Sequence, residues 1–333
     1  MRIIKLLSPL LAGILILSLY GCGGKPEESS RQESSEESSE YEMPTEYPVV
    51  IEGVTIRSKP DKIVSLSPAL TEKLYDIKLE EYLVGVSDFC DYPTNVLSLP
   101  QCGTARLPNL EEIKRLKPQI LLTQAPLAEE DLIALQQMDI DVVTMPLATG
   151  IAQFKQSYVS LAALLEGKYT GALYGEDFVK NLDDRFDFLK SYLLPYTREN
   201  GAKNALYLRL LDFNVATGDT LENELMEIIG LHNIADGQTG WIYPEEIAKG
   251  EGRADFESVQ VIFMDEKFVN IKMLEQSDYY KGLQATLKDW YLYIDCIAFE
   301  RQSLRMLDIL EEMAAYAYPA AAPDGISDAV TAG

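Results

Sequence analysis

The chain has 333 residues, of which 53 are acidic and 29 are Lys or Arg, so its formal net charge at pH 7 is −24. This charge argues against nucleic acid or an anionic lipid surface as a partner, because both bind basic protein surfaces. The length suits one large domain or two of ordinary size.

Residues 1–21 have the pattern of a signal peptide. Arg2 and Lys5 flank the start of an apolar run over residues 6–20, and Gly21 precedes Cys22. The run is shorter than the ~20 residues that a spanning helix needs, and no later stretch is long and charge-free enough. The sequence 19–22 resembles a bacterial lipobox, which predicts a lipid on Cys22 and anchorage to the outer face of the cell membrane. The alternative is an ordinary secretory signal with a chance cysteine.

The two ends of the mature chain are predicted to lie outside the fold. Residues 22–48 are rich in Ser and Glu and have no apolar periodicity, which is typical of a disordered tether. Residues 320–333 are small and featureless, which indicates a flexible tail.

Residues 49–150 alternate between short apolar runs and helical spacings. The runs are rich in β-branched residues and predict buried strands at 62–66, 83–86, 119–123 and 141–145. Helical spacing predicts helices at 70–79, 110–116 and 128–138. Alternating strands and helices imply an α/β lobe with a mainly parallel sheet covered by helices on both faces.

Residues 151–195 are helix-compatible almost throughout, with a break near residues 167–175. Five apolar residues fall on one stripe of the second part, and Pro195 is expected to end the helix. These residues are Phe178, Leu182, Phe186, Leu189 and Leu193. One long rigid helix therefore joins two lobes.

Residues 196–319 repeat the α/β pattern. Strands are predicted at 204–209, 259–264 and 290–294, and helices at 221–229 and 303–316. Trp290 begins the last strand and is expected in the core. A ligand groove is expected between the lobes, outside the carboxyl ends of their strands.

Three cysteines remain besides Cys22. Cys90 and Cys102 are close enough in sequence to form a disulfide outside the cell, or they are two reduced and unrelated thiols. Cys296 is expected as a buried thiol beside a strand. No cysteine and histidine spacing supports zinc, and His232, the only histidine, is interpreted as part of a helix-end cap.

Ordered motifs run through both halves of the chain. They are Ile63-Val64-Ser65-Leu66-Ser67-Pro68-Ala69-Leu70-Thr71-Glu72, Gly85-Val86-Ser87, Asp91-Tyr92-Pro93, Asn109-Leu110-Glu111-Glu112-Ile113, Leu116-Lys117-Pro118-Gln119-Ile120, Ala216-Thr217-Gly218, Glu224-Leu225, Gly230-Leu231-His232-Asn233-Ile234-Ala235 and Phe299-Glu300-Arg301. Their order and spacing resemble the cobalamin- and siderophore-binding proteins of ABC importers. The resemblance implies two α/β lobes joined by a rigid helix, no enzymatic activity and no cofactor of the protein's own. It also implies a monomer that serves a membrane permease and its ATPase subunit.

The resemblance assigns one acidic residue of each lobe to docking on the permease. Glu111 fits the first position and Glu246 the second, with Glu245 as a close competitor. Glutamates at these helix starts also favour the helix dipole, and Asn109 with Glu112 forms a capping-box pattern. Capping and docking are compatible.

Five residues are candidates for ligand binding in the groove. The resemblance points to Tyr92, Trp241 and Arg301, with Trp241 on a Gly-rich loop that suits a lid. Arg106 precedes the docking helix, and Arg209 ends a predicted strand. Each of them either faces the groove or forms an ion pair on the surface. Turn packing for Tyr92 and loop anchoring for Trp241 are the alternatives.

The predicted cargo is a bulky metal chelate. Ala105 and Gln124 stand where cobalamin binders carry tryptophans, so the resemblance implies a corrinoid, haem or a ferric siderophore without choosing among them. A surface sensor or structural lipoprotein with a degenerate pocket is the alternative. An enzyme based on carboxylates and direct capture of zinc or manganese are less consistent with one histidine and no nucleophile motif.

Overall fold

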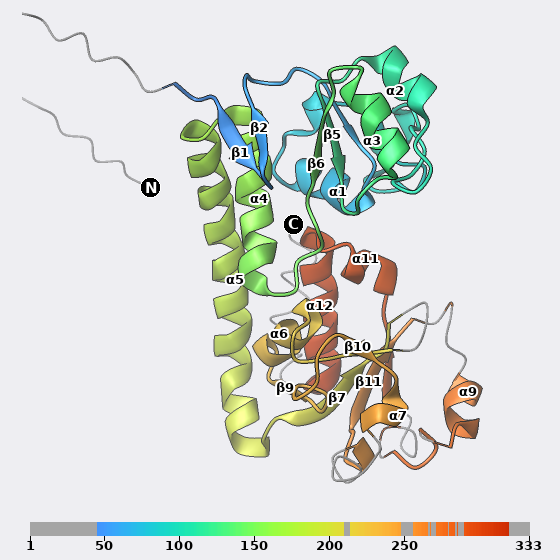
Figure 1. Ribbon diagram of the computed structural model, residues 1–333. Helices are drawn as coiled ribbons and strands as arrows, with labels where there is room; N and C mark the ends of the chain where they lie inside the picture. Colours follow the sequence, from blue (N-terminus) through green and yellow to red (C-terminus); the bar gives the residue numbers. More distant parts are fainter. Residues whose placement is uncertain are drawn as a thin grey trace, which may run out of the picture. The chain divides into compact units, whose positions relative to one another are not determined.

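The computed structural model describes residues 45–209, 214–247, 256–265, 267, 271–278, 280–283, 285 and 290–319, without the side chains of 271, 273 and 274. Two α/β lobes are joined by a pair of helices (Figure 1). The predicted signal peptide, Cys22, most of the tether and the tail lie outside the described residues.

The N-terminal lobe is built on a fully parallel four-stranded sheet, as predicted. Its strands have the order β4-β3-β5-β6 and are β3 (Ile63–Ser65), β4 (Leu83–Val86), β5 (Ile120–Thr123) and β6 (Asp141–Thr144). Its helices are α1 (Pro68–Asp76), α2 (Leu110–Leu116) and α3 (Glu129–Gln136), with 3-10 turns η1 (Glu80–Tyr82) and η2 (Thr94–Ser98). Helix α1 starts at residue 68 because the Ser67 hydroxyl accepts a hydrogen bond from the Leu70 amide at 3.2 Å and caps the helix.

The C-terminal lobe repeats the arrangement. Its parallel sheet has the order β12-β11-β7-β9 and consists of β7 (Lys203–Tyr207), β9 (Leu231–Asn233), β11 (Val261–Met264) and β12 (Tyr291–Tyr293). The described helices are α6 (Leu221–Ile228), α7 (Pro244–Ile247), α9 (Ile271–Gln276), α11 (Cys296–Glu300) and α12 (Leu304–Ala317). A short antiparallel pair, β8 (Val215–Ala216) with β10 (Trp241–Ile242), lies beside this sheet.

The segment between the lobes contains two helices, α4 (Ile151–Glu166) and α5 (Thr170–Asn200), which run side by side in Figure 1. The predicted break is confined to residues 167–169, because Gly171 and Gly175 are helical and let α5 approach the α4 backbone. A Cβ on Gly171 would lie 2.2 Å from the Ala162 carbonyl oxygen. The predicted stripe on α5 is confirmed, since Leu182 and Leu193 are each 1% exposed.

Helix α5 does not end at Pro195, so that prediction is wrong. The helix continues through Pro195 to Asn200. A proline inside a helix costs about 3 kcal/mol. Here Leu193 is buried and Tyr192 and Tyr196 pack against the same core, so tertiary packing keeps the chain helical past the proline.

Residues 46 and 47, which fall inside the predicted tether, contact the helices between the lobes. The Tyr47 hydroxyl donates to the Leu164 carbonyl at 3.0 Å, and the Glu46 carboxylate accepts from the Tyr169 amide at 3.0 Å. A hairpin that the sequence did not predict follows, with β1 (Val49–Ile51) antiparallel to β2 (Val54–Ile56). The boundary at residue 48 is therefore a few residues too late.

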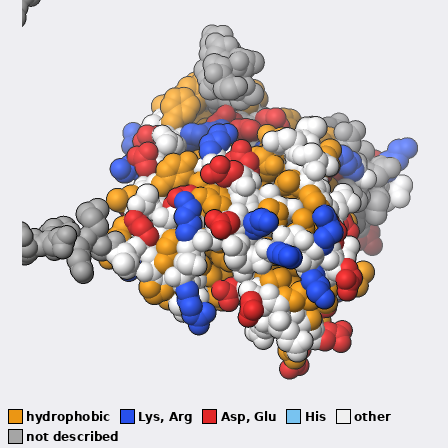
Figure 2. All heavy atoms as spheres, turned by 90° about the horizontal axis from the view of Figure 1, so that it is seen from above, with side chains coloured by type: hydrophobic (Ala, Val, Ile, Leu, Met, Phe, Trp, Pro, Cys, Tyr) orange, Lys and Arg blue, Asp and Glu red, His pale blue; other side chains and the backbone are white. Residues whose placement is uncertain are grey.

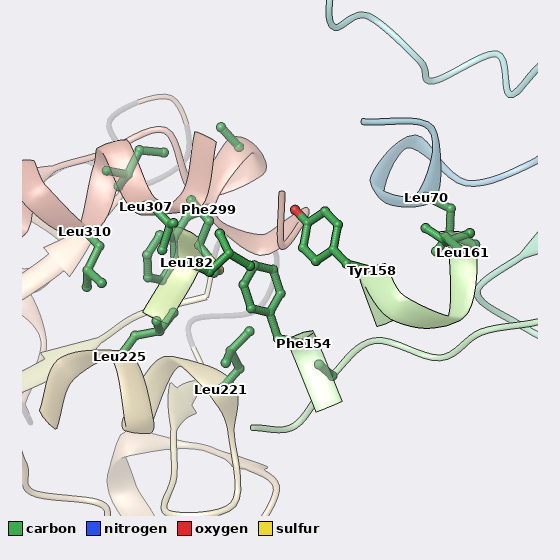
Figure 3. Packing of buried hydrophobic residues seen from close by; sticks show 14 of the residues in the cluster. Leu70, Phe154, Tyr158, Leu161, Leu182, Leu221, Leu225, Phe299, Leu307 and Leu310 are labelled. Carbon is green, nitrogen blue, oxygen red and sulfur yellow. The ribbon is translucent and has the colours of Figure 1, made fainter. Parts of the chain in front are cut away.

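One apolar core extends through both lobes (Figure 3). Leu70 of α1 and Leu161 of α4 belong to the same buried cluster as Phe299 of α11 and Leu310 of α12. Tyr158 and Phe154 lie between these groups in the picture. Because close-packed cores resist small rearrangements, this continuity holds the lobes in a fixed relation.

Candidate ligand-binding site

A pocket of about 230 Å³ lies where the crossover from β6 to α4 meets the C-terminal lobe. Its wall includes Arg209, which follows β7, and Trp241 of β10. The rest comes from residues 147–149 of the crossover, residues 219–222 at the start of α6, Gly240, Glu300 at the end of α11 and Gln302 just after it. The pocket therefore lies at the carboxyl end of a parallel strand, where open α/β sheets place ligands.

An aromatic face and a cation stand together on the pocket wall. The Arg209 guanidinium carbon lies 4.6 Å from the centre of the Trp241 ring, and Trp241 meets Tyr207 edge-on with ring centres 6.1 Å apart. Trp241 pairs with Ala216 across the β8–β10 ladder, so the prediction that it belongs to a flexible loop is wrong. The strand fixes the indole in place.

Three carboxyl groups share this wall with Arg209. The Asp219 carboxylate accepts from the Gly240 amide at 2.6 Å and the Thr217 hydroxyl at 2.8 Å, and these bonds lower its pKa. Glu300 accepts from the Tyr207 hydroxyl at 2.9 Å.

Glu222 is the most deeply buried of the three acids. It is 7% exposed, and burial raises its pKa to about 7. The charge of Glu300 contributes to this rise in the pKa, and the charge of Arg209 opposes it. The buried Glu222 carboxyl is thus influenced by one carboxylate, Glu300, and one guanidinium, Arg209.

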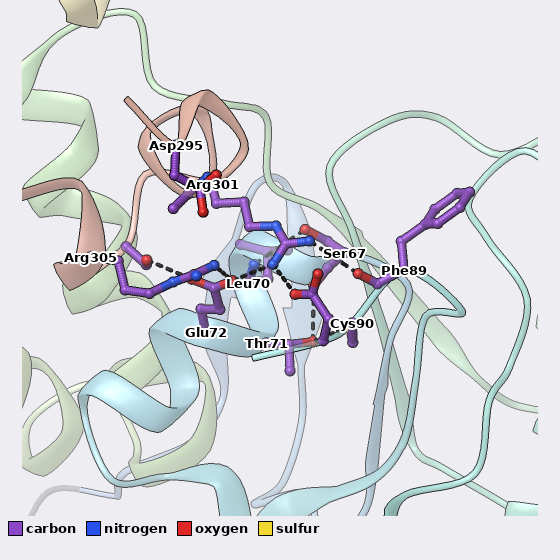
Figure 4. A network of polar contacts seen from close by, with 12 residues as sticks. Ser67, Leu70, Thr71, Glu72, Phe89, Cys90, Asp295, Arg301 and Arg305 are labelled. Atoms are coloured by element: carbon purple, nitrogen blue, oxygen red, sulfur yellow. Dashed lines mark hydrogen bonds and ion pairs between the residues drawn. The ribbon is translucent and has the colours of Figure 1, made fainter. Parts of the chain in front are cut away.

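A second polar cluster joins the lobes beside the pocket (Figure 4). Glu72 of α1 is 1% exposed and accepts hydrogen bonds from Arg301 at 2.8 Å, Arg305 at 2.7 Å and Ser303 at 2.6 Å. Arg301 also pairs with Asp91 and donates to the Phe89 carbonyl at 3.1 Å. We call these six residues the inter-lobe cluster.

A family model described as periplasmic binding protein matches residues 63–286, more than half of the chain. The chain belongs to the periplasmic binding protein family. Both of its lobes carry the parallel sheets flanked by helices that the resemblance implied, and the long helix α5 joins them.

Curated relatives and solved structures agree with this placement. The chain is 25% identical over 319 residues to YvrC, an uncharacterized ABC transporter substrate-binding lipoprotein of Bacillus subtilis, covering 93% of this chain and 95% of that protein. It is 27% identical over 186 residues to a vitamin B12-binding protein of Yersinia pestis, covering 54% of this chain and 62% of that protein. A periplasmic heme-binding protein of Pseudomonas aeruginosa superposes with a TM-score of 0.66 at 20% identity, over 80% of this chain and 95% of that chain.

These likenesses make the chain a substrate-binding protein of the ABC-transporter type and not an enzyme. In the described residues no helix is long and apolar enough to cross a membrane. Nor does this part of the binding protein hold a cluster of three or more His, Cys, Asp or Glu side chains arranged for a metal ion.

Two of the five predicted ligand residues, Trp241 and Arg209, line the pocket of this periplasmic binding protein. Arg301 belongs to the inter-lobe cluster instead. Tyr92 is 42% exposed, and the Arg305 guanidinium carbon lies 4.1 Å from its ring centre. Arg106 is exposed and outside the pocket lining.

Sequence reasoning missed Glu222, Glu300 and Gln302. The Gln302 side chain accepts from the Ala148 amide and donates to the Ala148 carbonyl, both at 2.8 Å, so it holds the crossover against the end of α11. Glu300 and Gln302 flank or adjoin Arg301, which the motif did identify. The motif therefore pointed to the right segment of the chain, but the side chains that line the pocket are those on either side of Arg301.

The two predicted docking residues are exposed at helix starts. Glu111 lies in the first turn of α2, and Glu246 is more exposed than Glu245 in α7, which begins with Pro244. The Asn109 side chain caps α2 by accepting from the Glu112 amide at 3.2 Å. The Glu112 carboxylate pairs with Arg115, so only half of the predicted capping box forms.

Cys90, Cys102 and Cys296, the three cysteines that the structure describes, are free thiols, so the possible disulfide between Cys90 and Cys102 is not formed. Cys90 packs with Ile63 in the main core, whereas Cys102 packs with Val64 in a separate cluster. Successive residues of a strand face opposite sides of its sheet, so the sheet separates the two thiols. Cys296 is a buried thiol, as predicted.

His232 does not cap a helix, and that interpretation is wrong. It lies in β9, where its ring is half exposed and its Nδ1 is 3.7 Å from the Asp236 carboxylate. Trp290 is partly buried against a second hydrophobic cluster, which lies in the C-terminal lobe, as predicted.

Proposed function

We propose that this protein captures a bulky metal chelate, namely a corrinoid, haem or a ferric siderophore, and delivers it to an ABC importer. The observation that carries the proposal is the Trp241 and Arg209 pair on the wall of a pocket at the carboxyl end of β7. An indole face stacks on flat conjugated rings, and a guanidinium donates to polar groups at their edge. Relatives named for vitamin B12 and heme binding support this class of cargo.

The size of the pocket indicates how such a ligand binds. A volume of about 230 Å³ accepts the edge or a side arm of a chelate but not the whole molecule. The body of the ligand then lies across the pocket mouth, on the side of the exposed crossover residue Leu147. The pocket is thus a subsite that contacts only the periphery of the ligand.

Anchorage at the membrane forms part of the proposal. A lipid on Cys22 and a Ser- and Glu-rich tether keep the binding protein near its permease and raise its effective concentration there. YvrC, which aligns with 93% of this chain, is itself named a lipoprotein.

Glu111 and Glu246 are the proposed contacts to the permease. They belong to different lobes, and each carboxylate is exposed at the first turn of its helix. On the face shown in Figure 2, acidic and basic side chains are interspersed, so the net charge does not gather there into a single acidic patch. Recognition by permease arginines then depends on individual carboxylates.

Uptake by host cells tests the proposal. Deleting the gene for this chain is expected to abolish uptake of one labelled chelate among cobinamide, cobalamin, hemin and ferric siderophores, and the wild-type gene restores it. A Cys22→Ala variant releases the protein from the membrane and lowers uptake. Unchanged uptake of every chelate in the deletion strain contradicts the importer role and favours a surface sensor or structural lipoprotein.

A further inference from the structure

A larger pocket, of about 600 Å³, lies between α2 and α3, two neighbouring helices of the N-terminal lobe (Figure 1). Its walls come from the last turn of α2 and the residues just after it, and from α3 and the residues that lead into β6. We call it the α2–α3 pocket. It shares no lining residue with the pocket beside Trp241, so the two are separate sites.

The α2–α3 pocket has an apolar floor and a cationic rim. Pro118 and Ile140 are buried, and Met138 is half-buried beside them. The two lysines of the lining, Lys114 and Lys117, are both exposed. This combination suits a partner group that has an apolar body and an acidic neighbour, because the floor desolvates the body while the rim attracts the negative charge.

The two lysines are unpaired within the part of the chain that the structure describes. Neither Lys114 nor Lys117 forms a hydrogen bond or an ion pair there, whereas Arg115, which lies between them, pairs with Glu112. Their charges favour the carboxyl end of the α2 dipole, but this role leaves the ammonium donors unused. A carboxylate of a partner therefore binds them without displacing a described acid.

The pocket adjoins the residue of this lobe that we assign to permease docking. Glu111 lies in the first turn of α2 and Lys114 three residues later, and both are exposed. Residues three apart on a helix are neighbours, with Cβ atoms about 5–6 Å apart. A permease loop that contacts Glu111 therefore comes within one helical turn of the pocket.

We infer that the α2–α3 pocket is a further contact for the permease, which places there an apolar side chain with an Asp or Glu beside it. The inference rests on the proposed function and extends its docking surface. Lys114, Lys117 and Gln137 are exposed, so a free small molecule would stay largely in water, whereas small-molecule sites bury most of their ligand. Opposite charges one turn apart, Glu111 and Lys114, also fix the register of the permease loop, because a shifted loop meets like charges.

Charge reversal at the rim tests the inference. Host cells that express a Lys114→Glu, Lys117→Glu variant instead of the wild type are expected to take up the chelate about tenfold more slowly, because like charges then face the permease. The affinity of the purified variant for the chelate is expected to stay at the wild-type value. A Lys180→Glu, Lys190→Glu variant is the matched control, since it changes the net charge equally on two exposed lysines of α5 and should keep wild-type uptake.

An Ala134→Phe variant tests the apolar floor without touching a charge. Ala134 is half-buried in the lining, so the larger side chain fills the pocket from the α3 side and is expected to lower uptake as well. Thermal unfolding of each purified variant verifies that the lobe remains folded. Wild-type uptake by Ala134→Phe would overturn the apolar occupant.

The outcomes distinguish this inference from the proposed function. Wild-type uptake by the Lys114 and Lys117 variant overturns the further contact and leaves the importer role in place. A wild-type dimer in analytical ultracentrifugation that this variant no longer forms overturns the inference in favour of a second copy of the chain. Absence of any chelate uptake that depends on the wild-type gene overturns the importer role, and the docking contact with it.

Discussion

Glu72 links the two lobes through its carboxylate. Its carboxylate is fully buried and is held by Arg301 and Arg305, which lie 229 and 233 residues further along the chain. The motif that contains Glu72 gave no indication of this role, since no pattern within a short window reports a partner so distant in sequence. Only the fold brings these charges together.

A Glu72→Gln variant is expected to be strongly destabilised, because it removes the buried carboxylate that Arg301 and Arg305 share and leaves Arg301 with Asp91 as its remaining acidic partner. Removing one partner of a buried ion pair typically costs about 3–5 kcal/mol. Urea unfolding followed by circular dichroism measures the change. Glu112→Gln is the matched control, because its pair with the exposed Arg115 is worth about 1 kcal/mol or less. Equal losses in both variants would contradict the account.

Glu222 makes the stability of the protein depend on pH. Its pKa is raised from 4.5 to about 7 in the folded state. The folded state therefore binds its proton more tightly than the unfolded chain does, so this contribution to stability is complete below pH 4.5 and is lost as the pH rises through about 7.

The Glu222→Gln variant is predicted to lack this loss. Each unit of pKa shift corresponds to about 1.4 kcal/mol, so above neutral pH the variant exceeds the wild type by on the order of 3 kcal/mol. The free energy of unfolding of both proteins, measured in urea from about pH 5 to about pH 8, tests this. Asp76, whose pKa is raised to about 6 chiefly by burial, leaves a weaker decline in the variant. Parallel pH profiles for the two proteins would rule out the role of Glu222.

At the level of elements, the contact between α4 and α5 depends on small residues. Gly171→Ala is expected to destabilise the protein by about 1–3 kcal/mol, because the new methyl meets the rigid α4 backbone at Ala162 and outweighs the helix propensity gained. Thermal unfolding measures the effect. Gly237→Ala is the control, since a Cβ there meets nothing within 4 Å. A Gly171 variant as stable as the wild type would show that the helices separate freely.

The predicted strands agree with the observed ones to within a few residues at either end. Short β-branched runs such as 119–123 are buried on both faces of a parallel sheet, and this leaves a clear signal in the sequence. Strands β1, β2, β8, β9 and β10 were missed because pieces of two or three residues carry too little periodicity to be recognised. Pro195 was misjudged because tertiary packing overrides a local helix breaker.

Less of the candidate site was predictable than of the fold. Trp241 and Arg209 were identified as single residues, and the structure shows that they touch. Arg301 was identified as a candidate for ligand binding, yet its guanidinium forms ion pairs with Glu72 and Asp91. Motifs record which residue types recur at a site, but the distribution of charge between neighbouring side chains depends on three-dimensional contacts.

At the scale of the whole molecule, docking and ligand binding are expected to be separable. A Glu111→Lys, Glu246→Lys double variant should lose at least about tenfold in chelate uptake by cells, because reversed charges repel arginines on the permease. Its affinity for the chelate in solution should equal that of the wild type, because neither residue lines the pocket. Uptake assays and titrations on the same variant check both statements. Wild-type uptake by the double variant would remove Glu111 and Glu246 from the docking surface.

Fluorescence titration shows whether a chelate binds beside Trp241. The chain has two tryptophans. Trp241 lies on the pocket wall, and Trp290 packs against the second hydrophobic cluster of the C-terminal lobe. We predict that one equivalent of a single chelate quenches the fluorescence of the Trp290→Phe variant, and that the Trp241→Phe variant shows little quenching. Absence of binding by every corrinoid, haem and ferric siderophore tried, or quenching carried equally by Trp290, would contradict the account.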